Sequence, residues 1–451
     1  MSDLSAIAAR IINEAFSDES MEAYVSRGVE TDIAAYDGEV ESLTQASSSG
    51  VGVRILRPAD GGFQVGFSWA GSLDDDSVRR AITQARENAT FSSVDPYAGL
   101  AEPDGHAIQQ LELASSTFSA MSIDDKIALA LELERATLAR DRRIKGVDHA
   151  SYGDFRAEAA IATTSGIASA DERTGAYLSV SALAGTDDET QSGYGLCVGR
   201  DPKDLDADLV VRDAVERSTR LLGASKPASG RVTMVLDPRV TSTVLGQIAA
   251  ALSGDAVVRG RSFFVDRLGE MVASERVTLV DDPTDTRFFG ASAVDAEGLA
   301  CRRNVLINEG RLEQFVYDSQ SARRAGAQST GSAVRGGFAG HPSAGCQALL
   351  LSPGSQDLDA LLAEVQDGIY VQSISGVHSG VSSISGDFSV GAEGLIIRNG
   401  ALAEPFREAT VASTLQRMLQ NVMGVASDLT WLPGLAAGVS VAIGDVQLSG
   451  R

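Results

Sequence analysis

Hydrophobic residues near the N-terminus recur at the spacing of one helix face. They are Leu4, Ile7, Ala8, Ile11 and Ala15, and they predict an amphipathic helix. Two strand-like runs follow, VGVRIL from Val51 and GGFQVGFSW from Gly61, joined by the turn-forming PADGG. A second helix is expected to open at Ser72, with three acidic residues from Asp74 in its first turn, where the helix dipole favours negative charge. The pattern predicts an N-terminal α+β domain over residues 1–112.

A middle α+β domain is predicted over residues 113–222. Ser122 and Asp125 form a capping-box-like start for a helix that continues to Arg140. Three alternating stretches are then expected to be successive antiparallel strands, namely AEAAIATTSGIASA, TGAYLSVSALAG and GYGLCVG. A helix from about Leu205 to Leu222 closes the unit. The small, polar run GASKPASG at residues 223–230 is the clearest linker in the chain.

The remaining residues, 231–451, predict a larger β-rich C-terminal domain. RVTMVLD is typical of a buried strand, and a helix is expected from Pro238 to about Leu252 because proline suits the first turn. GLACRRNVLINEGRLEQFVYD predicts a hairpin that turns at Asn308–Gly310, and many short strands follow. The predicted fold class is therefore α+β, with N-terminal α/β segments of antiparallel strands flanked by helices.

Size and charge narrow the class of protein. The chain has 451 residues, more than the roughly 250–300 that one hydrophobic core accommodates. Its 61 acidic and 38 basic residues give a net charge of −23, which disfavours contact with nucleic acid. The apolar stretch from Trp431 to Ile443 is interrupted by proline and glycine and is too short for a membrane span.

The cysteine content and the start of the chain bear on location. Only three cysteines occur, widely spaced, which excludes a disulfide framework and favours a reducing compartment. The opening MSDLSAIAARIINEAF carries charges throughout and is typical of a helix, not of a signal peptide. We therefore predict a soluble cytoplasmic protein that binds neither nucleic acid nor membranes.

Candidate metal ligands are sparse. The chain has four histidines, and no two of them share a helical turn. The best cluster is His341 with Cys346, together with His378 downstream, and it could be a His/Cys metal site. The alternative is a glycine-rich loop with one polar histidine and one buried cysteine. We favour that alternative because no second local pair supports metal binding.

A serine nucleophile is also weakly supported. The Gly-x-Ser-x-Gly motif is absent. His378 could act as a base, oriented by Asp387, with Ser382, Ser383 or Ser385 as the attacking group. The alternative is a serine-rich pair of strands with turn glycines, and we favour it because serines are abundant throughout this stretch.

Three stretches resemble the TldD/PmbA family. GVSSISGDFSVGAEGLIIRNG, at residues 380–400, closely resembles the family's C-terminal signature. RRNVLINEGRLEQFVYDSQSARRAGAQSTG resembles its hairpin and Ser-Thr-Gly loop, and YDGEVESLTQASSSGVGVRI is similar to its N-terminal strands. The resemblance covers nearly the whole chain. It marks a set of signature or substrate-channel residues: His378, Ser385, Gly386, Asp387, Phe388, Gly391 and Gly394. For Asp387 and Phe388 we favour a structural role in a turn.

The family has two branches, of which the TldD branch carries His-Glu-x-x-x-His on a helix and a later cysteine ligand. The matching helix here is LGQIAAALSGD. Alignment on its last residues places Leu245 at the first His position, Gly246 at the Glu position and Ala250 at the second His position. None of these side chains can bind zinc or act as a base. The resemblance therefore implies the PmbA (TldE) branch, with no metal or catalytic residue in this chain.

The resemblance implies a non-catalytic partner subunit of a heterodimeric zinc metallopeptidase, with zinc in a TldD-like partner. Such pairs degrade unfolded or flexible peptides. They are linked to maturation of a peptide antibiotic that targets gyrase and to antitoxin turnover, hence the label modulator of DNA gyrase. Two alternatives remain. One is a stand-alone peptide-binding or scaffold homodimer without proteolytic activity, and the other is an independent hydrolase that uses His378 and Asp387.

Overall fold

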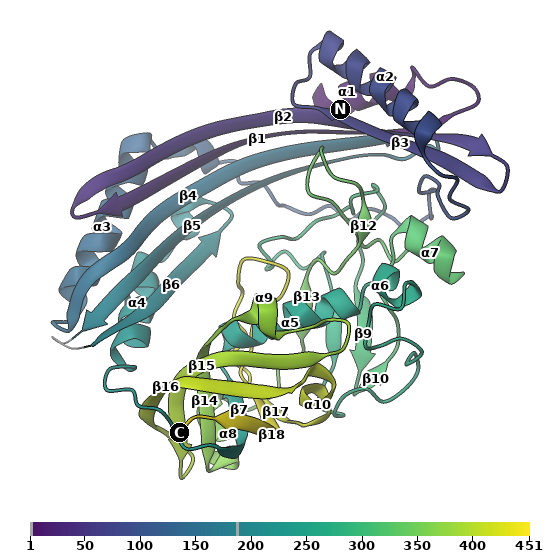
Figure 1. The fold of residues 1–451 in the computed structure, drawn as a ribbon. Coiled ribbons are helices and arrows are strands. Elements are labelled where there is room, and N and C mark those ends of the chain that lie inside the picture. Colours follow the sequence, from purple (N-terminus) through teal and green to yellow (C-terminus); the bar gives the residue numbers. More distant parts are fainter. Residues whose placement is uncertain (1–2, 186–188) are drawn as a thin grey trace.

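The computed structural model describes residues 3–185 and 189–451, and the fold is α+β as predicted (Figure 1). Two six-stranded sheets dominate it, one formed by the N-terminal strands and one by the C-terminal strands. The helices are α1 (Asp3–Ile12), α2 (Asp75–Phe91), α3 (Ile123–Arg140), α4 (Ala207–Thr219), α5 (Pro238–Ala251), α6 (Gly254–Val258), α7 (Ser319–Ala325), α8 (Leu358–Val365), α9 (Val377–Gly380) and α10 (Leu415–Gln420). The strands are β1 (Ser20–Tyr36), β2 (Glu39–Ala59), β3 (Gly62–Ala70), β4 (Ile144–Thr163), β5 (Ala168–Gly185), β6 (Thr190–Gly199), β7 (Gly230–Leu236), β8 (Leu279–Asp281), β9 (Asn304–Asn308), β10 (Arg311–Leu312), β11 (Ala333–Val334), β12 (Ser343–Ala344), β13 (Leu349–Leu351), β14 (Gly368–Ser375), β15 (Asp387–Arg398), β16 (Ala401–Thr414), β17 (Val422–Val425) and β18 (Val441–Ser449).

The N-terminal sheet is a long curved layer that arches over the C-terminal half of the chain (Figure 1). Its strand order is β3-β2-β1-β4-β5-β6, and all neighbouring strands are antiparallel. Strands from both predicted N-terminal units thus share one sheet, since β1 pairs with β4. The boundary at residues 112 and 113 stays a prediction.

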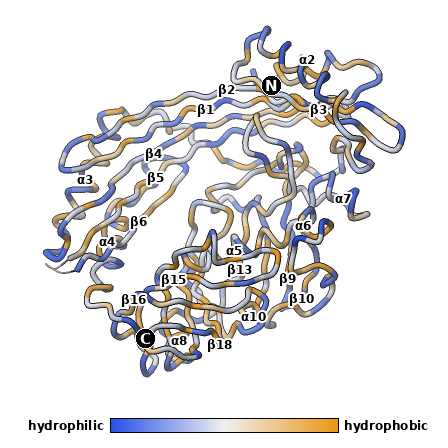
Figure 2. The backbone as a smooth tube through the Cα atoms, viewed as in Figure 1, coloured by the Kyte–Doolittle hydropathy of each residue, from blue (hydrophilic) through white to orange (hydrophobic). Residues whose placement is uncertain are grey.

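One face of this sheet is covered by the four N-terminal helices. Alternate residues along β1 enter their cores, with Met21, Ala23 and Val25 packed against α1 and α2. Farther along the same face, Ile33 packs in the core that contains α3 and α4. The alternation along the long strands is visible in Figure 2. Because successive strand residues point to opposite faces, the even-numbered residues of β1 lie on the concave face.

The C-terminal sheet has the order β16-β15-β14-β7-β18-β17. Its largest core contains α5 and α10 together with residues from most of these strands, and α8 packs on a separate core with Val235 and Tyr370. A smaller sheet, β10-β9-β8-β13, flanks it. Within the described residues, no helix is long and apolar enough to cross a membrane.

Most predicted elements are present, and two details differ. The second helix is capped by Asp74, not Ser72, because the Asp74 carboxylate accepts a hydrogen bond from the amide of Ser77 at 2.8 Å. The stretch AEAAIATTSGIASA is not one strand. It contains the turn between β4 and β5, where Gly166 adopts φ +99°. The hairpin at Asn308–Gly310 is confirmed, with β9 and β10 on either side.

Candidate functional site

The C-terminal half of the chain reaches the concave face through a loop that crosses two glycines of β2. The chain passes so closely there that a Cβ atom at Gly52 would lie 2.2 Å from the carbonyl oxygen of Phe338, and one at Gly50 would lie 2.6 Å from the Phe338 ring. The Phe338 ring also contacts that of Trp69, with centroids 5.9 Å apart. Only glycine permits this approach at these positions.

A buried ionic cluster joins the sheet to the same loop. Glu22 of β1 lies opposite Arg54 of β2 in the sheet register, and its Oε2 atom accepts a hydrogen bond from Arg54 Nη2 at 2.6 Å. Its Oε1 atom accepts one from Arg335 Nη2 at 2.6 Å. The side chains of Glu22 and Arg335 are each 2% exposed. Burial opposes ionisation of Glu22, but Arg54 and Arg335 outweigh it and lower its pKa to about 2.

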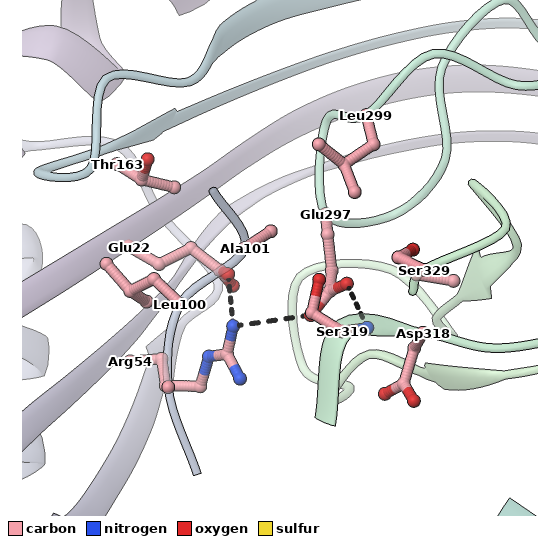
Figure 3. Close-up of polar contacts among 12 residues, drawn as sticks. Glu22, Arg54, Leu100, Ala101, Thr163, Glu297, Leu299, Asp318, Ser319 and Ser329 are labelled. Atoms are coloured by element: carbon pink, nitrogen blue, oxygen red, sulfur yellow. Dashed lines mark hydrogen bonds and ion pairs between the residues drawn. The ribbon is translucent and has the colours of Figure 1, made fainter. Parts of the chain in front are cut away.

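The cluster continues to Glu297 and the start of α7 (Figure 3). Glu297 Oε2 accepts a hydrogen bond from the amide of Ser319 at 2.9 Å, and its Oε1 atom lies 3.9 Å from Arg54 Nη2. Burial raises the pKa of Glu297, although Arg54 opposes this. On α7, Arg323 donates to the carbonyl oxygens of Tyr97, Gly99 and Leu100. These contacts fix the C-terminal half against the concave face.

The three positions that match the zinc motif lie in different surroundings on α5. Leu245 is 4% exposed and faces an apolar cavity of about 30 Å³, beside Val277 and Met418. Gly246 is half-buried, with open space where a Cβ would be, and Ala250 is exposed. No lone pair is available at any of the three, so these residues do not fit a zinc ion. Across residues 3–185 and 189–451, no group of three or more His, Cys, Asp or Glu residues could hold a metal ion.

The His341, Cys346 and His378 side chains do not form a metal site in the described part of the chain. The His341 ring packs on Phe67, with centroids 4.1 Å apart, and burial together with nearby arginines lowers its pKa. Cys346 is buried, which raises the pKa of its thiol well above the ordinary value. His378 is exposed on the short helix α9. The predicted alternative, a loop histidine and a buried cysteine, describes this arrangement better.

The signature stretch builds a tight turn before β15. Asp387 Oδ2 accepts a hydrogen bond from Ser385 Oγ at 2.6 Å, and Gly386 adopts φ +83°. Phe388 is 2% exposed and belongs to the main C-terminal core. His378 makes no hydrogen bond with Asp387 or with a neighbouring serine among the described residues, so the three parts of a hydrolase triad are not joined.

The remaining signature glycines lie where the sheet is crowded. Around Gly394 of β15, an added Cβ would lie 1.9 Å from the carbonyl oxygen of Tyr370, and around Gly391 it would lie 2.4 Å from Ser375 Oγ. These glycines therefore permit close strand packing. His378, Ser385 and Asp387 are exposed, whereas Phe388 and Gly394 are buried.

The sequence interpretation missed the ionic cluster. One signal was present, because Arg54 is a charged residue inside the apolar run VGVRIL, and buried arginines are almost always paired. Its partners Glu22, Arg335 and Glu297 come from distant parts of the chain, and nothing in the local pattern connects them.

Comparison with known proteins gives a consistent result. Family models for the PmbA/TldA metallopeptidase match residues 21–89 (domain 1), 116–222 (central domain) and 229–450 (C-terminal domain). The metalloprotease PmbA of Escherichia coli O157:H7 is 26% identical over 96% of this chain and 93% of its own length. A metalloprotease TldD homologue of Haemophilus influenzae is 28% identical over 86% of this chain and 82% of its own.

Solved structures also match over the full length. A Bacteroides thetaiotaomicron protein described as a modulator of DNA gyrase has a TM-score of 0.88 and 27% identity over 100% of both chains. TldE from Thermococcus kodakarensis has a TM-score of 0.87 at 21% identity, covering 99% of both chains. The latter likeness is one of fold alone.

Proposed function

Because this chain belongs to the PmbA/TldD metallopeptidase family, we propose that it is the zinc-free PmbA (TldE) subunit of a cytoplasmic two-subunit peptidase. The observation that carries this proposal is the occupancy of α5 by Leu245, Gly246 and Ala250 at the motif positions. A TldD-like partner then supplies zinc and hydrolysis, and this chain supplies no catalytic residue. Its three cysteines are free thiols, which fits a reducing compartment.

The concave face of the long sheet suits the role of a chamber wall. Small residues occupy it at half-buried positions, including Ser26 and Gly28 on β1 and Ala157 and Ala159 on β4. Small side chains leave room for an extended chain, and backbone contacts require no particular sequence. We propose unfolded or flexible peptides as substrates of the complex, including peptide-antibiotic precursors and antitoxins.

An open edge of β2 supports an interface with the partner. Strand β3 pairs only with Val51–Ala59, so the outer edge of residues 39–50 has no neighbouring strand among the described residues. These residues are mostly exposed, and they include no lysine, arginine or proline. Natural sheets usually protect long edges with such residues. Glu39 and Glu41 are the only charged residues on this edge, so most of its length is suited to pairing with another subunit.

Reconstitution with a TldD-like chain from the same source tests the proposal. We expect no stoichiometric zinc in the purified chain alone, about one zinc ion per pair in the complex, and peptide cleavage only by the complex. The control is a complex whose partner carries Glu→Gln in its His-Glu-x-x-x-His motif, which should assemble but not cleave. Tightly bound zinc and robust cleavage by this chain alone would refute the proposal. A stable homodimer that neither binds nor stimulates the partner would favour the stand-alone scaffold.

A further inference from the structure

A second polar region lies beside the ionic cluster, in a cavity of about 350 Å³ between the concave face and the C-terminal half. Its walls come from β1, β4 and β5 on one side and from loops near Phe289, Asp295 and Leu435 on the other. The volume is within the range of small-ligand sites. Its lining includes the apolar side chains of Tyr24, Phe289 and Leu435, and Arg173 and Arg335 bring positive charge.

The arginines around this cavity are incompletely neutralised by the protein. Arg335 lies over the ring of Tyr24, 4.5 Å from its centroid, and its Nε and Nη1 atoms are buried without hydrogen-bond partners. Arg173, on the concave face of β5, forms no hydrogen bond or ion pair among the described residues. Arg200 has an unpartnered Nη1 and lies 6.0 Å from the centroid of Phe289, a lining residue. The Arg335 side chain is buried, whereas Arg173 and Arg200 are half-buried. A guanidinium that is partly withdrawn from water is stabilised when an anion joins it.

Two carboxylates, Asp171 and Asp295, also line the cavity, and neither forms an ion pair with an arginine among the described residues. Asp171 shares the concave face of β5 with Arg173. Burial raises the pKa of Asp171, and the nearby Arg173 and Arg200 partly offset this. Asp295 accepts hydrogen bonds from the amides of Glu297, Leu299 and Ala333. Its pKa is raised to about 7, mainly by burial and then by Glu297, so a fraction is neutral at pH 7. The cavity lining thus carries two arginines and two aspartates, and Arg173 is the arginine that pairs with no carboxylate among the described residues.

We infer that this cavity binds a carboxylate group of a peptide, with Arg173 as the direct ligand and Tyr24 and Phe289 as the apolar walls for the adjoining residue. The bidentate geometry of a guanidinium matches a carboxylate, and Arg335 and Arg200 add positive potential behind it. The choice of a peptide rests on the proposed function. The group could be the C-terminal carboxylate or an acidic side chain, and the test separates these two sources.

The test uses isothermal titration calorimetry of the full chain with the acetylated peptide Ala-Ala-Phe-Ala-Ala. Three forms are compared: the free acid, the C-terminal amide, and an amide with glutamate at the fourth position. We expect the free acid to bind about tenfold more tightly than the plain amide, because one charged hydrogen-bonded contact is gained. If the glutamate amide matches the free acid, the site accepts side-chain carboxylates as well.

Arg173→Gln should abolish the difference between acid and amide. The side chain it replaces has no partner in the described structure, so the fold does not depend on it. Arg142→Gln, an exposed position before β4, removes the same charge far from the cavity and should leave the difference unchanged. Equal affinity of the wild type for acid and amide would overturn the inference, as would an undiminished difference in Arg173→Gln.

These outcomes are independent of the partner role. Binding of the acid by the isolated chain is measured without a TldD-like subunit, whereas the proposed function fails when this chain does not stimulate cleavage by that subunit. A chain that stimulates cleavage but binds acid and amide equally would retain the proposed function and lose the carboxylate site.

Discussion

Replacing Glu22 by glutamine would leave two buried guanidinium groups facing one neutral amide. Glu22 accepts hydrogen bonds from both Arg54 and Arg335 at 2.6 Å, and it is 2% exposed. Lowering its pKa from 4.5 to about 2 corresponds to about 3 kcal/mol of native-state stabilisation. Removal of one member of a buried ion pair typically costs about 3–5 kcal/mol. We therefore expect Glu22→Gln to lower the free energy of unfolding by about 3 kcal/mol at pH 7.

The pH dependence gives an independent check. A carboxyl group with a depressed folded-state pKa stabilises the protein fully above its unfolded pKa, and the stabilisation is lost as the pH falls through the folded value. Between pH 7 and 3.5, the difference between wild type and Glu22→Gln should shrink by about 1.4 kcal/mol. Urea titrations followed by tryptophan fluorescence measure this difference in the free energy of unfolding, since Trp69 lies beside the Phe338 loop.

Glu132→Gln is the matched control. Glu132 also pairs with an arginine, Arg135 at 2.6 Å, but its side chain is 53% exposed. A surface pair of this kind contributes about 0–1 kcal/mol. If Glu22→Gln cost no more than Glu132→Gln, or if the difference from wild type did not shrink toward pH 3.5, the assignment of a stabilising buried cluster would be wrong.

Three further outcomes are expected. Asp281 is fully buried, which raises its pKa to about 6, so its own contribution to the free energy of unfolding falls as the pH rises from 4 to 7. Asp281→Asn should therefore gain about 2 kcal/mol relative to wild type over that range in urea titrations, and a flat difference would contradict the burial argument. Gly52→Ala should displace the Phe338 loop and cost about 1–3 kcal/mol, seen as faster proteolysis there; an unchanged rate would count against the close approach. Gln45→Lys with Ser47→Lys should weaken assembly with a TldD-like chain in sedimentation without unfolding this chain, and full assembly would exclude that edge.

Much of the local structure could be predicted from the sequence. The helix over α5 follows from its apolar spacing and from Pro238 in its first turn, and Ser122 caps α3 as its position indicated. The hairpin at Asn308–Gly310 could be predicted from its turn residues, and in the structure Glu309 and Gly310 adopt positive φ in a short turn. Each of these signals lies within a few residues of the element that it specifies.

The arrangement of the long sheet could not be predicted in this way. Glu22 pairs in register with Arg54 on one side and with Thr163 on the other, and no periodicity connects strands so far apart. The turn inside AEAAIATTSGIASA was missed because small residues satisfy the alternating pattern on both sides of it. The candidate cavity could not be predicted from the sequence for the same reason. Arg173 and Arg335 come to line one cavity only when the C-terminal half folds against the concave face.

The packing of α5 shows that the surroundings of the motif positions, and not only the residues there, are unsuited to zinc ligands. Leu245 and Ala250 are five residues apart, so they are separated by about 140° around the helix, with Leu245 in the core and Ala250 exposed. A histidine at position 245 would face Val277 and Met418 in a cavity of about 30 Å³, where a polar ring without a partner costs about 1–3 kcal/mol. Restoring the three motif residues would thus place a polar ring in the apolar core at position 245 and destabilise that core. Under the proposed function, only the partner subunit binds zinc, and the packing of α5 in this chain is consistent with that. A zinc site in this chain would require α5 to be repacked against α10.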